Sequence, residues 1–284
     1  MNNRIERNAI ITGVVVGMMM AAAGWLAYYL SGAEALLLDG NFSFIGVLAT
    51  LLGLRISSIK KRTSKTYPFG KFVYEPTYSF FIGLLTVGVI LAAVAGNVTK
   101  ITKYFQGEQF PIIDTSVILV YTIVMVVLCF GLAVLFAYSN RRLKGNSTIL
   151  GAYTVQSTID GLLSAGAGGA LILFGFASPD GTFGFLTQIG DALTVLLLCL
   201  LVMYQPIKLI KDSFIELSGG ALNDPIVTDK IRSVVSEHIE NTEIADLFIS
   251  KTGSGYLVVA FMKAGFFGKH NSQKLLRSCF KIMR

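Results

Sequence analysis

The sequence predicts a helical membrane protein with six membrane-spanning helices, followed by a small C-terminal domain of mixed α/β structure. The chain of 284 residues is 53% hydrophobic and only 14% charged, and its mean hydropathy is +0.65. Soluble domains carry about 25% charged residues, so this chain has too little charge to cover the surface of a soluble protein. Its apolar residues also gather in long runs that short polar links separate.

Each apolar run has roughly the 20 residues that a spanning helix needs. A segment of this kind crosses a bilayer only as a helix, because lipid offers its backbone N–H and C=O groups no other partner. The first run is too long for the apolar part of a cleavable signal peptide. The six predicted spans cover residues 9–30, 34–56, 76–98, 114–138, 149–176 and 186–210.

Basic residues are distributed unequally between the links. Thirteen Lys and Arg lie in the N-terminal segment, in the links after the second and fourth spans and at the end of the sixth span, whereas the other side holds only Lys100 and Lys103. Lys and Arg concentrate in cytoplasmic loops, so both termini are predicted to be cytoplasmic. This topology also explains the net charge of +7, and we expect no nucleic-acid partner.

The composition changes after Asp212, so residues 1–212 are expected to form the transmembrane domain and residues 213–284 a cytoplasmic domain. Asp224-Pro225 predicts the start of a helix, with Asp224 as its N-cap. The order helix, strand, strand, helix follows, with the strands and the last helix over residues 247–249, 256–261 and 271–283. Two strands make a thin core, so this domain is expected to pair with a second copy.

Two of the spans carry a carboxylate near their middle, Asp39 and Asp160. A charge at the centre of a bilayer costs about 2.5–3.5 kcal/mol on insertion scales, and such residues usually bind or relay something. Asp39 and Ser43 share one helix face, as do Gln156 and Asp160, because four residues separate the members of each pair. Together the two faces offer four oxygens, which suit a divalent cation that prefers hard ligands. A structural role stays open, since such side chains also hydrogen bond between membrane helices.

Other polar residues of the spans are expected to be unrelated to this site. Glu34 and Asp191 fall near the outer ends of their spans, where acids are ordinarily solvated, and Asn97 is also expected at the membrane interface. The three cysteines are isolated in the sequence, which predicts neither a disulfide framework nor a cysteine metal site.

These features together resemble the cation diffusion facilitators, a family of divalent-metal efflux transporters, over nearly the whole chain. Ser31–Ser43 resembles the start of the family's second helix, which carries a pair of metal ligands. The link Tyr67-Pro68-Phe69-Gly70-Lys71 resembles the family's His-Pro-Phe-Gly-His sequence. The family's His-x-x-x-Asp corresponds to Gln156–Asp160, and Asp191-Ala192-Leu193 is similar to the start of its sixth helix.

The resemblance implies a homodimer in the lipid bilayer that exports a divalent cation from the cytoplasm by alternating access, commonly in exchange for protons. It implies a ferredoxin-like C-terminal fold, here α-β-β-α and without the family's last strand. A transporter of this kind is not an enzyme, so we expect no catalytic residue and no bound cofactor. The expected location is the inner membrane of a bacterial cell, as a multi-pass protein.

The chain departs from the family at several expected ligands. Only Asp39 and Asp160 keep the family's residue type, whereas Ser43 replaces an acid and Gln156 replaces a histidine. The metal site is therefore expected to comprise Asp39, Ser43, Gln156 and Asp160 and to take zinc, iron, manganese or a similar ion. Gln156 does not titrate, so any proton exchange would depend on the two acids.

Two further metal sites of the family are expected to be absent. Tyr67 and Lys71 replace the two histidines of the link, and Ala245 and Phe261 stand where the C-terminal domain often has ligands. These losses leave an alternative open, namely a transport-inactive relative with a structural or regulatory role in the membrane.

Overall fold

The computed structural model describes residues 2–68, 70–110, 115–143, 147–176, 184–221, 224–238 and 244–262. The chain divides into two compact units. The first comprises Met1–Arg55 and Phe81–Ile210, and the second comprises Ile56–Phe80 and Lys211–Arg284.

Six helical stretches within the described residues are long and apolar enough to cross a membrane, which confirms the predicted class. The last stretch consists of two helices that meet at Met203 and continue beyond the expected end at residue 210. The helices are α1 (Asn2–Ser31), α2 (Glu34–Ile59), α3 (Tyr74–Phe105), α4 (Thr115–Arg142), α5 (Thr148–Gly175), α6 (Leu186–Val202) and α7 (Tyr204–Leu217).

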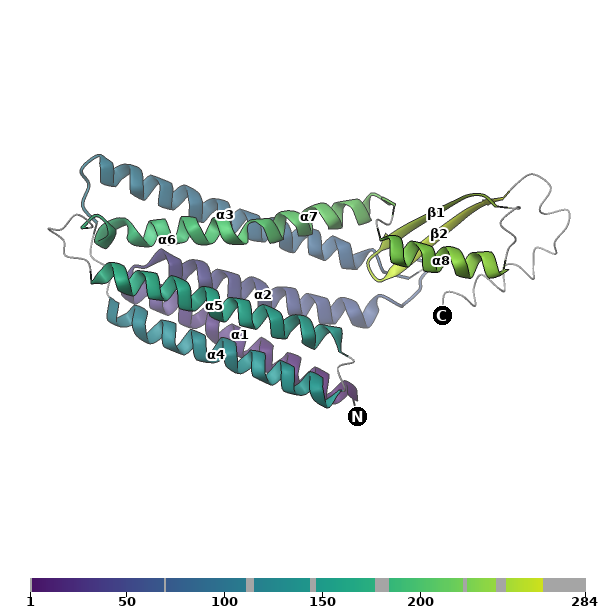
Figure 1. Ribbon diagram of the computed structural model, residues 1–284, viewed down its shortest axis with the longest axis horizontal. Coiled ribbons are helices and arrows are strands. Elements are labelled where there is room, and N and C mark those ends of the chain that lie inside the picture. Colours follow the sequence, from purple (N-terminus) through teal and green to yellow (C-terminus); the bar gives the residue numbers. More distant parts are fainter. Residues whose placement is uncertain are drawn as a thin grey trace. The chain divides into compact units, whose positions relative to one another are not determined.

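In the first unit, α4 packs against both α1 and α5, and α5 packs in turn against α6 (Figure 1). Helix α1 approaches α2 closely at two glycines, since a Cβ added to Gly24 would lie only 2.7 Å from the Cα of Gly40. Small residues allow such backbone approach between membrane helices. The close crossing holds the N-terminal part of α2, which carries Asp39, against the bundle.

Apolar side chains on the outward faces of these helices are largely exposed. Leu26, Val127 and Leu200 are each more than half exposed, although their helices also contribute to a buried core. Since exposed apolar side chains are stable in contact with lipid tails, this pattern fits helices that pack inside a bilayer and present their remaining faces to lipid.

The second unit contains helix α8 (Pro225–His238) and the antiparallel strands β1 (Ile244–Thr252) and β2 (Gly255–Met262). Asp224 caps α8 as expected, since its Oδ1 accepts a hydrogen bond of 3.2 Å from the backbone N–H of Val227. The strands are longer than the sequence predicted, and Thr252 pairs with Gly255 across a tight turn. Gly253 in this turn has a positive φ of 57°, a conformation that glycine adopts without strain. The predicted last helix, Asn271–Met283, lies outside the described residues.

Polar side chains tie the tip of this hairpin to helix ends of the same unit. Glu75 forms an ion pair of 2.8 Å with Lys60 and accepts a hydrogen bond from the backbone N–H of Ser254. Glu216 near the end of α7 forms an ion pair of 2.8 Å with Lys251 and accepts a hydrogen bond from the N–H of Gly253. The hairpin turn is therefore held by carboxylates from α3 and α7.

Candidate functional site

Asp39 is held inside the first unit by side chains from two other helices. Its Oδ2 accepts a hydrogen bond of 2.8 Å from the Tyr121 hydroxyl on α4 and one of 3.3 Å from the Ser164 hydroxyl on α5. Tyr121 and Ser164 are both buried. A carboxylate that accepts two hydrogen bonds at one oxygen keeps its other oxygen available for a further partner.

Asp160 lies one turn before Ser164 on α5, and its side chain is exposed from the folded chain. Because Ser164 reaches the Asp39 carboxylate from the same helix, Asp160 brings a second acid to the neighbourhood of Asp39. A pair of acids in mutual repulsion favours a shared cation or a shared proton. The arrangement is therefore suited to exchanging one for the other.

The other two expected ligands lie less favourably. Ser43 is half-buried on α2, and Gln156 is exposed on α5. Within the described residues, none of the four side chains expected to bind metal hydrogen bonds to another of the four. The described residues also contain no group of three or more His, Cys, Asp or Glu side chains that could hold a metal ion. The four-residue site remains a prediction.

The sequence interpretation missed Tyr121 and Ser164. Ser164 was detectable, because it continues the four-residue spacing of Gln156 and Asp160 along the same face of α5. Tyr121 gave a weaker signal: its hydroxyl lies in an apolar span, but only the packing of α4 shows that this hydroxyl reaches Asp39 on α2.

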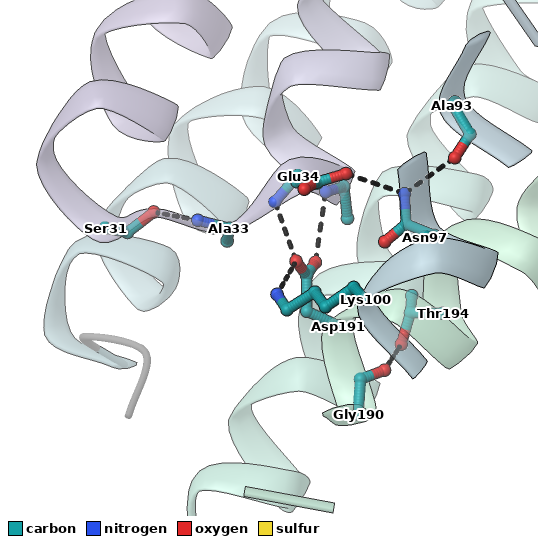
Figure 2. Close-up of polar contacts among 10 residues, drawn as sticks. Ser31, Ala33, Glu34, Ala93, Asn97, Lys100, Gly190, Asp191 and Thr194 are labelled. Carbon is teal, nitrogen blue, oxygen red and sulfur yellow. Dashed lines mark hydrogen bonds and ion pairs between the residues drawn. The ribbon is translucent and has the colours of Figure 1, made fainter. Parts of the chain in front are cut away.

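Asp191 is completely buried, so the expectation that it is solvated is wrong. Its two oxygens accept hydrogen bonds of 2.8 and 3.0 Å from the backbone N–H groups of Glu34 and Ala35, at the start of α2 (Figure 2). A carboxylate satisfies the unpaired N–H groups of a first helical turn and interacts favourably with the helix dipole. Asp191 of α6 thus caps α2 from a distant part of the chain.

Helix α3 completes this arrangement. The Lys100 ammonium lies 3.6 Å from Asp191, and the Asn97 side-chain N–H₂ donates a hydrogen bond of 2.7 Å to the Glu34 carboxylate. Asn97 is fully buried among the helices. We call Glu34, Asn97, Lys100 and Asp191 the end cluster, since it lies where α2 and α6 begin and near the end of α3.

In the link between α2 and α3, a lysine lies over two tyrosine rings. The cation diffusion facilitators, which the sequence resembles, have histidines at two of these positions. The Lys71 ammonium lies 5.9 and 5.8 Å from the ring centres of Tyr67 and Tyr74. A hydrogen bond between the Tyr67 and Tyr74 hydroxyls is the main cause that raises the pKa of Tyr67. A cation on two aromatic faces is a stable arrangement that needs no metal.

The residues that replace the ligands of the C-terminal domain are only partly described. Phe261 on β2 is exposed, and its ring packs edge-on against Phe248 of β1 with 5.8 Å between ring centres. The side chains of Ala245 and His238 lie outside the described part, as does the whole of His270.

Comparison with known families identifies the family of this chain. The family model of the cation efflux transmembrane domain matches residues 10–218, about three quarters of the chain and all six spanning stretches. A search of curated proteins finds no match.

Proposed function

Because the chain belongs to the cation efflux family, we propose that it exports a divalent metal cation from the cytoplasm by alternating access. The family match and the six spans make it a multi-pass membrane protein that transports cations, and members of this family are transporters rather than enzymes. The divalent charge of the cargo, the export direction and the mechanism are parts of the proposal.

The half-buried position of Asp39 and its two hydrogen bonds carry the proposal. A carboxylate that α2 brings to buried hydroxyls of α4 and α5 lies at the meeting point of three spanning helices. An acid inside a spanning helix is costly without a counter-charge, and Asp160, one turn before Ser164 on α5, adds a second acid nearby. A divalent cation shared by both acids offsets that cost. Ser43 and Gln156 would supply further oxygens once the two helix faces turn toward each other.

Protons would take the place of the cation when the site is empty. Gln156 cannot titrate, so Asp39 and Asp160 are the proton carriers of this proposal. Each cation that leaves would be replaced by protons on the two carboxylates, which keeps the site close to neutral in both states. Uptake of cation into vesicles would therefore release protons from the protein.

The proposed orientation places both termini in the cytoplasm of a bacterial cell, with the protein in the inner membrane. It follows from the excess of Lys and Arg in the links on one side. The C-terminal domain would join two copies into a homodimer, since its two-stranded sheet buries little by itself.

A second candidate is a transport-inactive membrane protein with a structural or regulatory role. The exposed position of Gln156 and the hydrogen bonds that already occupy Asp39 favour it. Metal sensitivity of cells that lack the protein separates the two candidates. Reintroduced parent should restore growth at high metal concentration, and the Asp39→Asn and Asp160→Asn variants should not. Equal restoration by parent and variants would favour the second candidate.

A further inference from the structure

The end cluster contains more negative than positive charge. Glu34 and Asp191 are carboxylates and Lys100 is the one cation of the cluster, which gives a net charge of −1 when all three are ionised. Asp191 is fully buried, and a buried charge is stable only when it is well paired. The contact of 3.6 Å from its Oδ2 to the Lys100 ammonium is longer than a hydrogen bond. Lys100 is thus a loose counter-ion.

Asn97 adds an oxygen that has no partner. Its Oδ1 is the one buried side-chain polar atom without a hydrogen bond among the described residues. Leaving such a group unpaired costs about 1–3 kcal/mol. Figure 2 shows this oxygen on the side where Asp191 and Lys100 lie. Exchanging the two amide atoms does not help, because the oxygen would then face the Glu34 carboxylate and the Ala93 carbonyl, which accept the present hydrogen bonds.

We propose that the end cluster is a second, weak cation site on the export path, with oxygen ligands from Glu34, Asn97 and Asp191. Lys100 occupies it as a tethered counter-ion when no metal is present. The inference rests on the proposed function, whose orientation places this cluster at the outer end of the helices.

The chemistry of the cluster defines the cation that it takes. Two carboxylates and an amide carbonyl are hard ligands, which suit manganese, magnesium or calcium better than thiolate-seeking metals. When a divalent ion enters, the flexible Lys100 stem carries its ammonium away toward the membrane surface. The two carboxylates of the cluster then balance the double positive charge of the ion. Because the ion displaces this ammonium, binding is weak, and an exit site must release its ion readily.

Titration with Mn²⁺ alone, followed by electron paramagnetic resonance of the full chain in detergent, tests the proposal. The double variant Asp39→Asn/Asp160→Asn lacks both acids of the central site. Mn²⁺ that this variant binds therefore reports on the end cluster. Adding Lys100→Met should raise the affinity about tenfold or more, which corresponds to about 1.4 kcal/mol. Adding Asn97→Leu should weaken binding. Lys103→Met is the matched control, because Lys103 lies one turn after Lys100 on α3 and pairs with Glu108 instead of the end cluster. This substitution should leave the Mn²⁺ affinity unchanged.

Unfolding temperatures with and without Mn²⁺ separate binding from a purely structural role. The metal should stabilise the Lys100→Met variant more than the Asn97→Leu variant. No Mn²⁺ binding to the Lys100→Met variant in that background, or a Lys100→Met chain that fails to fold even with Mn²⁺, overturns the proposal. Failure of the proposed function would appear separately, as normal transport by the Asp39→Asn and Asp160→Asn variants.

Discussion

Replacing Tyr121 by Phe tests whether the central carboxylate depends on its hydrogen-bond partners. The substitution removes one hydroxyl, which donates at 2.8 Å to Asp39, and leaves the ring in place. A hydrogen bond to a charged group contributes about 1.5–3 kcal/mol, equivalent to roughly 10- to 150-fold in an equilibrium constant. Loss of a partner that orients a metal-binding carboxylate typically lowers metal affinity about 10- to 100-fold. We therefore expect the cation concentration for half-maximal uptake to rise within this range.

The assay is initial uptake into vesicles as a function of cation concentration. Tyr153→Phe is the matched control, because the Tyr153 hydroxyl also forms a hydrogen bond between two helices. It donates at 3.3 Å to the Thr50 hydroxyl, which is neutral. This substitution should change the half-maximal concentration little. If the two variants behave alike, or if Tyr121→Phe matches the parent, then the Tyr121 hydrogen bond does not prepare Asp39 for a cation.

Three other predictions concern the fold. Gly24→Ala should lower the unfolding temperature and cost about 1–3 kcal/mol of unfolding free energy, because the added Cβ meets the backbone of α2. The Cβ of Gly46→Ala enters open space, so this control should be neutral or stabilising. Asp224→Ala should cost about 0.5–2 kcal/mol and speed hydrogen exchange in the first turn of α8. A hydrogen bond to Glu216 raises the pKa of Lys251. Their ion pair should therefore stabilise the fold fully at pH values below the ordinary lysine pKa of about 10.4, and this stabilisation should be lost as the pH rises above the raised pKa. Glu216→Gln should therefore lose at most about 1 kcal/mol of unfolding free energy at pH 8, and should equal the parent in strong alkali.

The six spans could be predicted from sequence because the bilayer imposes a single length and composition on every spanning helix. Their ends were harder to predict, since neither composition nor length marks where a helix leaves the membrane. Helix α7, for example, continues to Leu217, where Glu216 binds the hairpin turn. Such an end depends on a contact between residues far apart in the chain.

The polar residues of the spans could be found from sequence but not paired. Spacing along one helix identifies a shared face, which is how Asp39 and Asp160 were singled out. It carries no information about the neighbouring helix, so the Tyr121 hydroxyl was missed. Asp191 was expected in solvent because its position in the span suggested the membrane boundary. Its burial follows instead from the packing of α6 against the start of α2.

Uptake into vesicles, with the internal metal counted by elemental analysis, tests the central claim most directly. Purified parent protein should accumulate at least one of zinc, iron or manganese when a proton gradient is applied, and should release protons as it does so. Asp39→Asn and Asp160→Asn should each abolish accumulation while expression and unfolding temperature stay near the parent values. Accumulation by both variants at the parent rate would contradict the account, because the two acids would then have no part in moving the cation.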